Sequence, residues 1–297
     1  AASQRGYANV YDTDIYQTKG LPSDYASGSR ESNLKSNFDN GVTVEFWLKV
    51  GTIDANDLQT VLDITNNESP EQRLQIQLSG TSGSPFRITL NSGSVSSSLN
   101  SIGSGPTTSS LTSFTHCAIV LQNVSSAVQA KLYIDGVLDH TTNLVMATTS
   151  SVSAFEQKNL KGRIAAAFDG TNTFSGSIDE FRFWKVTRNG AEIGRNWYTH
   201  IRGGANSDIS NADLGVYYKF NEGTTGVTST DSTVLDYSGR ISNGTWTGTV
   251  SRTLSSAIVE ASASAAEYKD PIIYASHGDV DALKINLEKT GSFHDSN

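Results

Sequence analysis

Apolar and polar side chains alternate with a period of two in several segments of the first 250 residues. The clearest segments are 42–49, 73–78 and 86–90, in which every second residue is Val, Leu, Ile or Phe. Because successive side chains of a strand point to opposite faces of its sheet, this pattern predicts strands with one buried face. The break at residues 83–85, which contains Gly and Pro, predicts that the last two segments form a hairpin.

Shorter runs predict further strands and one tight turn. Asp135-Gly136 tolerates positive φ at both turn positions, so residues 131–139 are expected to form a hairpin with a two-residue turn. A span rich in Ser, Thr and Gly at residues 92–113 is expected to be a long surface loop that includes a short strand. The other predicted strands are residues 116–122, 130–134, 164–168 and 214–220.

Residues 176–185 are predicted to form a strand that is rich in aromatic residues, and a helix start follows them. Bulky side chains on both faces are typical of a central strand that is covered on both sides. Asn189 and Glu192 have the spacing of a capping box, and the periodic apolar residues after them predict a helix that ends at residues 203–204. Strict alternation places Ile178, Glu180, Arg182 and Trp184 on one face of the strand and Asp179, Phe181, Phe183 and Lys185 on the other.

Many strands, several hairpins and a single helix predict an all-β sandwich. The net charge of -8 and the lack of any basic run exclude nucleic acid as a partner, because phosphate neutralisation needs Lys and Arg. No apolar stretch reaches the roughly 20 residues that cross a bilayer, so we expect no membrane insertion. The single cysteine, Cys117, lies in an apolar run and is expected to be a small buried hydrophobe.

The composition changes toward the C-terminus. Residues 1–255 are expected to form the sandwich, in which roughly the first 20 residues are an irregular entry arm. Residues 256–297 are expected to hold a small-residue linker and a short helix capped by Asp279. Because such a helix is not stable alone, we expect it to dock on another subunit or a following domain through residues 270–297. A start at Ala1 without Met is typical of a processed product or a piece of a longer protein.

Four runs carry a resemblance to a known family. They are residues 44–49, 132–137, 176–184 and 218–223, and the likeness covers residues 20–250 approximately. Together they resemble laminin-G-like modules of the concanavalin A-like lectin/glucanase superfamily. This resemblance implies a concanavalin A-like jelly-roll sandwich of two antiparallel sheets, one of them concave, with rim loops that engage glycans or protein ligands. It implies little about function, because the fold hosts lectins, glycanases and inert spacers alike.

A second resemblance concerns the biological setting. The Ser-, Thr- and Asn-rich, cysteine-poor composition and the segment 270–274 are similar to tandem modules in virion structural proteins of tailed phages, especially marine ones. This resemblance implies a location on a virion surface or otherwise outside the cell, as part of a larger assembly.

The sequence lacks a catalytic constellation, so we expect no enzyme activity. Retaining glycoside hydrolysis needs two carboxyl groups roughly 5 Å apart on one sheet face. Related glucanases present them as Glu-x-Asp-x-x-Glu on one strand, a run that this chain lacks. The adjacent Asp179 and Glu180 should point to opposite faces, with Asp179 bonding turn amides and Glu180 pairing with Arg182 or a neighbouring strand. The histidines are scattered, and no nucleophile elbow or zinc-ligand spacing is present.

Calcium is the one metal for which the sequence offers candidate ligands. Asp208, Asn211 and Asp213 lie close together in sequence and carry the oxygen ligands that calcium prefers. Asn and Asp are also ordinary turn formers, as we expect for Asp236 and Asn243. We expect no required cofactor and keep a structural calcium ion as a hypothesis.

Glycan binding requires planar aromatic rings that stack on sugars and amide or carboxylate groups that bond to hydroxyls. Trp246, flanked by Thr and Gly, is expected to be the most exposed aromatic candidate. Trp47, Trp184 and Trp197 have apolar neighbours and are expected in the core. The candidate ligand-binding residues are Trp246, Tyr217, Tyr237 and Asn172.

The sequence leaves three functional hypotheses open. The leading one is a non-enzymatic laminin-G-like module that decorates a virion or extracellular surface assembly and mediates adhesion to host-surface glycans. The first alternative is a structural spacer or cementing protein without a ligand, whose partners are neighbouring subunits. The second is an unrecognised polysaccharide hydrolase.

Overall fold

The structure of the chain is a computed structural model that describes residues 6–11, 33–66, 71–80, 83–93, 95–146, 152, 160–201, 213–222, 233–238 and 243–250. All of these residues except Tyr198–His200 belong to one compact unit. The predicted linker and helix of residues 256–297 lie outside the described residues.

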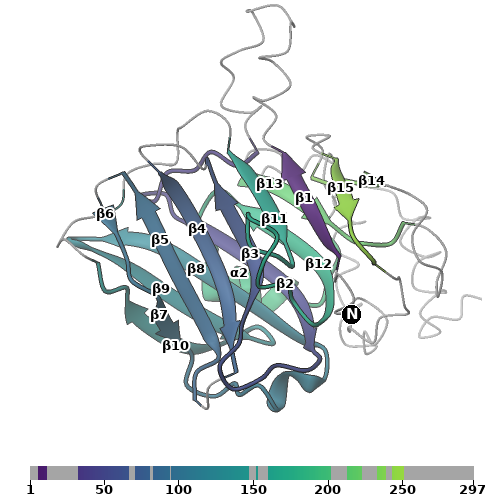
Figure 1. Ribbon diagram of the computed structural model, residues 1–297. Coiled ribbons are helices and arrows are strands. Elements are labelled where there is room, and N and C mark those ends of the chain that lie inside the picture. The colour runs from purple at the N-terminus through teal and green to yellow at the C-terminus, as the bar shows by residue number, and fades with distance from the viewer. Residues whose placement is uncertain are drawn as a thin grey trace, which may run out of the picture. The chain divides into compact units, whose positions relative to one another are not determined.

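The described strands form two antiparallel sheets that enclose a common core (Figure 1). The larger sheet has nine strands in the order β14 (Thr233–Val234), β15 (Gly244–Thr247), β1 (Tyr7–Tyr11), β11 (Lys161–Ile164), β3 (Leu58–Thr65), β4 (Gln72–Ser79), β5 (Phe86–Ser92) and β6 (Val95–Ser96), with β7 (Asn100–Ile102) also paired to β5. The smaller sheet has six strands in the order β10 (Val137–Asn143), β9 (Ala127–Ile134), β8 (Thr115–Val124), β2 (Val42–Val50), β12 (Gly176–Trp184) and β13 (Leu214–Tyr218). This is the concanavalin A-like jelly-roll sandwich that the sequence predicts.

The core lies between the two sheets and is built from the alternating apolar positions. Phe46 of β2, Ile76 of β4 and Ile88 of β5 are fully buried in it. Burial of such side chains supplies most of the driving force for folding, roughly 25 cal/mol for each Å² of apolar surface. Cys117 of β8 is a buried free cysteine, as predicted, and burial raises the pKa of its thiol well above the ordinary value.

Both predicted hairpins are confirmed. β4 and β5 pair with Leu78 opposite Phe86. β9 and β10 are joined by Asp135 and Gly136, whose φ angles of 46° and 79° are the two positive values of a type I′ turn.

A β-bulge interrupts β12 and corrects the prediction of strict alternation. Asp179 pairs with Trp47 of β2, but the next paired residue is Arg182, opposite Glu45. Glu180 lies inside the bulge and has a φ of 50°, in the left-handed region. The extra residue shifts every later side chain of the strand to the other face.

The bulge decides which side chains of β12 share a face. Ile178, Phe181 and Phe183 all pack in or against the main core, although strict alternation separates the first from the other two. Asp179 and Glu180 both lie on the outer face, because the first pairs with an outward residue of β2 and the second bonds to an outward arginine. The prediction that these two acids point to opposite faces is therefore wrong.

The predicted helix start is confirmed in α2 (Gly190–Asn196). The side chain of Asn189 accepts hydrogen bonds from the amides of Ala191 and Glu192, and the Glu192 carboxylate accepts one from the Asn189 amide. The helix is shorter than predicted, because Trp197 is already its C-cap residue.

The remaining differences lie at strand ends and in loops. The prediction of a strand at residues 164–168 is wrong, because β11 (Lys161–Ile164) ends where that strand should begin and the next residue, Ala165, has a φ of 73°. β3 was not predicted, because a register shift between Thr60 and Leu62 breaks the alternation of its side chains. The predicted loop at residues 92–113 holds β6, β7 and the short 3-10 helix η2 (Ser110–Thr112).

The β9–β10 turn yields a stability prediction. A Cβ on Gly136 would lie 2.4 Å from Cδ1 of Trp197, and the residue also has a positive φ. Gly136→Ala should therefore lower the free energy of unfolding by more than the roughly 1–2 kcal/mol that the backbone strain costs alone. Urea denaturation measures this change. Gly170→Ala is the matched control, because Gly170 has a φ of 86° but its Cβ would meet nothing closer than 3.6 Å. Equal losses in the two variants would contradict the role of the Trp197 contact.

Candidate functional site

The outer face of the six-stranded sheet carries a cluster of buried charges. Glu45 of β2 lies at its centre, with Oε1 3.0 Å from Nε of Arg188 and Oε2 3.4 Å from Nη1 of Arg182. Nε2 of His116 in β8 lies 3.7 Å from Oε2 of Glu45. Each of the four residues is at most 4% exposed, so the carboxylate depends on these partners to offset its loss of hydration.

Aromatic rings separate this cluster from solvent. The ring of Trp197 lies 5.5 Å from that of Trp47 and 6.0 Å from that of His116, between ring centroids. The guanidinium of Arg188 lies 4.0 Å from the centroid of Trp184. Trp47 and Trp184 are buried as predicted, whereas Trp197 is half-buried. A cluster enclosed in this way stabilises the fold and leaves no surface for a substrate.

The charge states follow from this enclosure. Burial by itself raises the pKa of the Glu45 carboxyl, but His116, Arg188 and Arg182 outweigh it and hold this pKa at about 2, below its ordinary value of 4.5. Burial lowers the pKa of His116, and Glu45 offsets only part of that effect. Near neutral pH the carboxylate is therefore charged and the imidazole neutral. A carboxyl group with so low a pKa does not serve as a general acid.

Glu180 and Tyr217 extend the cluster toward β13. Oε2 of Glu180 accepts a hydrogen bond from Nη2 of Arg182 at 3.2 Å and another from the hydroxyl of Tyr217. The predicted pairing of Glu180 with Arg182 is confirmed. Oδ1 of Asp179 accepts a hydrogen bond from the amide of Glu180, so this acid bonds a backbone amide as predicted. Both acids thus serve the structure of the strand.

The outer face of the nine-stranded sheet, called the polar face below, consists mainly of hydrogen-bonding side chains. Its main members are Tyr7 and Asn9 of β1, Arg163 of β11, Thr60 and Asp63 of β3, Arg73, Gln75 and Gln77 of β4, Arg87, Thr89 and Asn91 of β5, and Thr245 and Thr247 of β15. α2 packs against the other sheet through Ile193, so no helix of the described part of the chain covers the polar face. Its centre is nevertheless buried, because Thr60, Asp63, Gln75 and Gln77 are at most 7% exposed. The other members remain at least partly exposed, and their hydrogen-bonding groups are suited to a hydrophilic ligand.

Asp63 organises the centre of the polar face. Its carboxylate accepts hydrogen bonds from Nε and Nη2 of Arg73 at 2.9 and 2.6 Å, and from Nε2 of Gln75 at 3.0 Å. The amide of Phe168 donates a fourth bond at 2.9 Å. The side chain of Asp63 is fully buried, whereas that of Arg73 is 28% exposed. The pair therefore presents an oriented guanidinium to solvent, with little side-chain freedom left to lose on binding.

Aromatic rings lie beside this centre. The guanidinium of Arg163 lies 4.6 Å from the ring centroid of Tyr7 and 5.1 Å from that of Phe168. All three side chains are half-buried, so part of each remains exposed. Nearby, the amide nitrogen of Asn9 donates to the hydroxyl of Thr247 at 3.0 Å. Exposed ring surface next to amides and hydroxyls can stack on a sugar ring and bond to its hydroxyl groups.

Two of the predicted ligand-binding residues lie together. The rings of Tyr217 and Tyr237 meet edge to face at 6.2 Å, and Nζ of Lys219 lies 5.3 and 4.9 Å from their centroids. Tyr217 is fully buried, whereas Tyr237 is 36% exposed. Asp236 supports the pair, because its Oδ1 accepts a hydrogen bond from the Tyr217 amide and its own amide donates to Oδ1 of Asn243, which fits the predicted turn roles. Only one ring of this pair is available to a ligand.

The other two predicted ligand-binding residues lie apart from that pair. Trp246 of β15 is half-buried and packs against the main core, with its ring 5.5 Å from that of Phe220. The expectation that Trp246 is the most exposed candidate is wrong, because Tyr237 and Asn172 are more exposed. The backbone carbonyl of Asn172 accepts a hydrogen bond from the amide of Thr60, which places this exposed residue beside the polar face.

Of the predicted calcium ligands, only Asp213 is a described residue. Its backbone carbonyl accepts a hydrogen bond from the amide of Lys185, and Asp208 and Asn211 lie outside the described residues. Within the described residues, no three or more His, Cys, Asp or Glu side chains form a group that could hold a metal ion. No helix among them is long and apolar enough to cross a bilayer.

The sequence does not single out the polar face. Alternation places Arg73, Gln75 and Gln77 on the polar side of a strand, but it does not mark them as ligand contacts. The available signal was chemical, because Thr89 and Asn91 of the next strand also carry hydroxyl and amide groups at outward positions. The grouping of these strands with β1 and β11 has no local sequence signal.

The family of the chain is established by its sequence. Residues 23–194 match the Laminin_G_3 family, described as the concanavalin A-like lectin/glucanases superfamily. The chain belongs to this family, which confirms the resemblance found in its motifs. No curated protein sequence matches the chain.

Solved structures share the fold at low sequence identity. A Bacteroides ovatus protein, provisionally assigned as a carbohydrate-binding protein, is 16% identical with a TM-score of 0.52 over 86% of this chain and 62% of its own. A SAP-like pentraxin of Limulus polyphemus is 15% identical with a TM-score of 0.38 over 66% of this chain and 83% of its own. The CBM40 of the Ruminococcus gnavus IT-sialidase is 14% identical with a TM-score of 0.38 over 64% of this chain and 93% of its own. The chain thus spans less than two thirds of the Bacteroides protein, and such identities show the fold alone.

The buried charge cluster yields a pH prediction. The pKa of His116 is lowered in the folded state, so the unfolded chain binds more protons and stability should fall as the pH drops below about 6.5. The pKa of Glu45 is lowered from 4.5 to about 2, so roughly 3 kcal/mol more should be lost between those values. Urea denaturation across this pH range measures both losses.

Substitutions assign the losses to the cluster. His116→Gln should remove the first loss and reduce the second, because His116 is one of the groups that lower the pKa of Glu45. His140→Gln, outside the cluster, should leave the pH profile unchanged. A profile that is flat between pH 7 and 3 in the unsubstituted protein would contradict the electrostatic role of the cluster.

Proposed function

We propose that this chain is a non-catalytic carbohydrate-binding module whose glycan lies on the polar face. The observation that carries the proposal is the composition of that face, in which outward positions of neighbouring strands carry amide, hydroxyl or guanidinium groups. Membership of a lectin and glucanase superfamily supports it. The Bacteroides ovatus protein of similar fold, with its provisional carbohydrate-binding assignment, is consistent with it.

The arrangement of acids supports binding without hydrolysis. Asp63 is the central acid of the polar face, and its oxygens already accept four hydrogen bonds. A carboxylate whose oxygens are already occupied by these donors is not free to attack a sugar as a nucleophile. Glu45 and Glu180 are enclosed on the other sheet. Release of reducing sugars from laminarin, agarose or alginate by the purified protein would overturn this part of the proposal.

The biological setting belongs to the same proposal. The module decorates a virion or extracellular surface assembly, to which it attaches through residues 270–297, and it mediates adhesion to host-surface glycans. The resemblance of its composition to phage virion modules motivates this setting. The alternative is a spacer or cementing protein without a ligand, in which case the polar face would remain solvated.

The predicted residues offer a second place for glycan contacts. Tyr237 presents an exposed ring and Lys219 lies above it, while Tyr217 supports both from below. Asn172 lies beside the polar face and fits the first location. Trp246 would support glycan binding only indirectly, because its ring packs against the core and thereby holds β15 in place.

A glycan array followed by calorimetry tests the polar face. The unsubstituted protein should bind at least one class of glycan, and Tyr7→Ala should weaken that binding roughly three- to tenfold, because it removes the ring that flanks Arg163. Tyr237→Ala should leave the affinity unchanged. If Tyr237→Ala weakens binding and Tyr7→Ala does not, the site is the Tyr217–Tyr237 pair. If no glycan binds at high protein concentration, the spacer alternative is favoured.

Calcium is a separate part of the proposal. We place a structural calcium ion at Asp208, Asn211 and Asp213, on the basis of their oxygen ligands. Millimolar calcium should then raise the melting temperature above its value in excess EDTA, by an amount that corresponds to about 2.7 kcal/mol at 100 times the dissociation constant. Asp208→Ala should abolish this rise. An identical melting temperature with calcium and with EDTA would contradict the site.

A further inference from the structure

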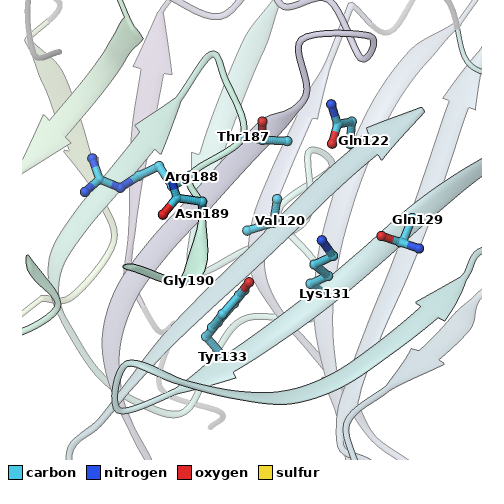
Figure 2. A pocket seen from close by; sticks show the side chains of 9 residues that line it. All are labelled: Val120, Gln122, Gln129, Lys131, Tyr133, Thr187, Arg188, Asn189 and Gly190. Atoms are coloured by element: carbon cyan, nitrogen blue, oxygen red, sulfur yellow. The ribbon is translucent and has the colours of Figure 1, made fainter. Parts of the chain in front are cut away.

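A small pocket lies on the outer face of the six-stranded sheet, away from the polar face. Figure 2 shows its lining, which comes from β8, β9 and the segment before α2: Val120, Gln122, Gln129, Lys131, Tyr133, Thr187, Arg188, Asn189 and Gly190. Its volume is about 160 Å³. Ordinary ligand pockets measure roughly 300–1,000 Å³, so this one admits a single small molecule or one unit of a chain.

The wall on the α2 side is fixed by hydrogen bonds and ion pairs. The amide of Thr187 donates to the carbonyl of Asn40, and the amide of Arg188 donates to the hydroxyl of Thr43. The guanidinium of Arg188 is held by Glu45 behind the wall. The pocket is therefore formed in advance of any ligand, which reduces the entropy that binding costs.

The floor is apolar and equally fixed. Val120 and Tyr133 pack with Ala118 and with Ile193 of α2 in a small buried cluster. The ring of Tyr133 also lies under Gly190, where a Cβ would be 3.4 Å from Cε1 of the ring. An apolar floor below a polar rim is suited to a ring with one hydrophobic face.

The rim holds polar groups without protein partners. Among the described residues, the ammonium of Lys131, the amide of Gln129 and the hydroxyls of Tyr133 and Thr187 make no hydrogen bond or ion pair. The residues that line the pocket include no Asp or Glu. Burial raises the pKa of Tyr133, so its hydroxyl remains a donor at neutral pH. The pocket thus offers one unpaired cation, Lys131, and several neutral donors, while its second cation, Arg188, is already paired with Glu45.

We propose that this pocket binds one carboxylated sugar unit, such as a hexuronate, with its carboxylate on Lys131. Gln129, Thr187 and the Tyr133 hydroxyl bond to the ring hydroxyls, and the apolar floor faces the ring. The site goes beyond the proposed function, because it lies on the opposite sheet from the polar face. With both sites filled, one module holds two sugar units on its two outer faces.

Amide and side-chain NMR spectra recorded during a titration test the proposal directly. Sodium glucuronate is the probe, and glucose is the neutral match of the same ring size. Glucuronate should shift the signals of Lys131, Gln129 and Tyr133 in a saturable way, and glucose should shift them at least tenfold more weakly, because a charge-assisted bond is lost. Equal effects of the two sugars, or no saturable shift with glucuronate at all, would overturn the proposal.

Substitutions assign the effect to the pocket. Lys131→Gln should weaken glucuronate binding about tenfold or more, whereas Lys131→Arg keeps the charge and should retain most of it. Lys49→Gln is the matched control, because Lys49 is an exposed lysine of β2 outside the pocket. If Lys49→Gln and Lys131→Gln weaken binding equally, the carboxylate interacts with general surface charge and the pocket assignment is wrong.

The outcome is separable from that of the polar face. Tyr7→Ala should leave glucuronate binding at the pocket unchanged, and Lys131→Gln should leave array binding through the polar face unchanged. Glycan binding that persists without any response to glucuronate would refute the pocket alone. A glucuronate response without any array binding would refute the polar face alone.

Discussion

The carboxylate of Glu45 is the charge on which one side of the sandwich depends. It belongs to β2, and its partners come from β8, β12 and the segment before α2. Loss of one of these partners would leave an uncompensated buried charge and lower the free energy of unfolding by roughly 3–5 kcal/mol. The strands and α2 must therefore assemble together in one register, so the part of the outer face around Glu45 serves to hold the fold. The rings of Trp47 and Trp197 keep water away from this cluster.

The nine-stranded sheet is organised in the opposite way. It also has a buried acid, Asp63, but here the arginine partner remains partly exposed and the surrounding side chains are amides and hydroxyls. The same principle, that a buried charge requires a partner, thus produces a sealed cluster on one sheet and an ordered, partly exposed polar surface on the other. The two sheets share one hydrophobic core, so the polar face inherits the rigidity of the scaffold beneath it. Rigid strands are better platforms for recognition than loops of equal composition.

Much of the fold could be predicted, because it depends on local signals. Alternation identified β2, β4 and β5, the Asp135-Gly136 turn fixed one hairpin, and the Asn189–Glu192 box fixed the start of α2. Each of these features is written in a few adjacent residues. The predictions failed where a single residue broke the period, as at Glu180 in β12 and at Ala165 after β11.

The candidate site could be predicted only in part, because its residues meet through the sheet order. Asn172 and Tyr237, two of the candidate ligand-binding residues, are exposed, but nothing in the sequence places Arg163 between Tyr7 and Phe168. Glu45 and its buried partners are likewise spread over more than a hundred residues, from Glu45 to Arg188. Trp246 was misjudged, since its Thr and Gly neighbours say nothing of Phe220, which packs on its ring. Composition near a residue does not reveal what the fold brings against it.

The bulge in β12 bears on how sequences of this family are compared. Residues 176–184, one of the four runs that carry the family resemblance, form this strand. An alignment based on hydrophobic alternation would assume a single inward–outward pattern along the whole strand. The phase changes at Glu180, where two residues of β12 oppose one of β2. A relative that lacks the bulge should align with a one-residue gap at this position. In such a relative, strict alternation would place adjacent residues at this point on different faces of the sheet. Without that gap, a comparison would assign core positions to the surface along half of the strand.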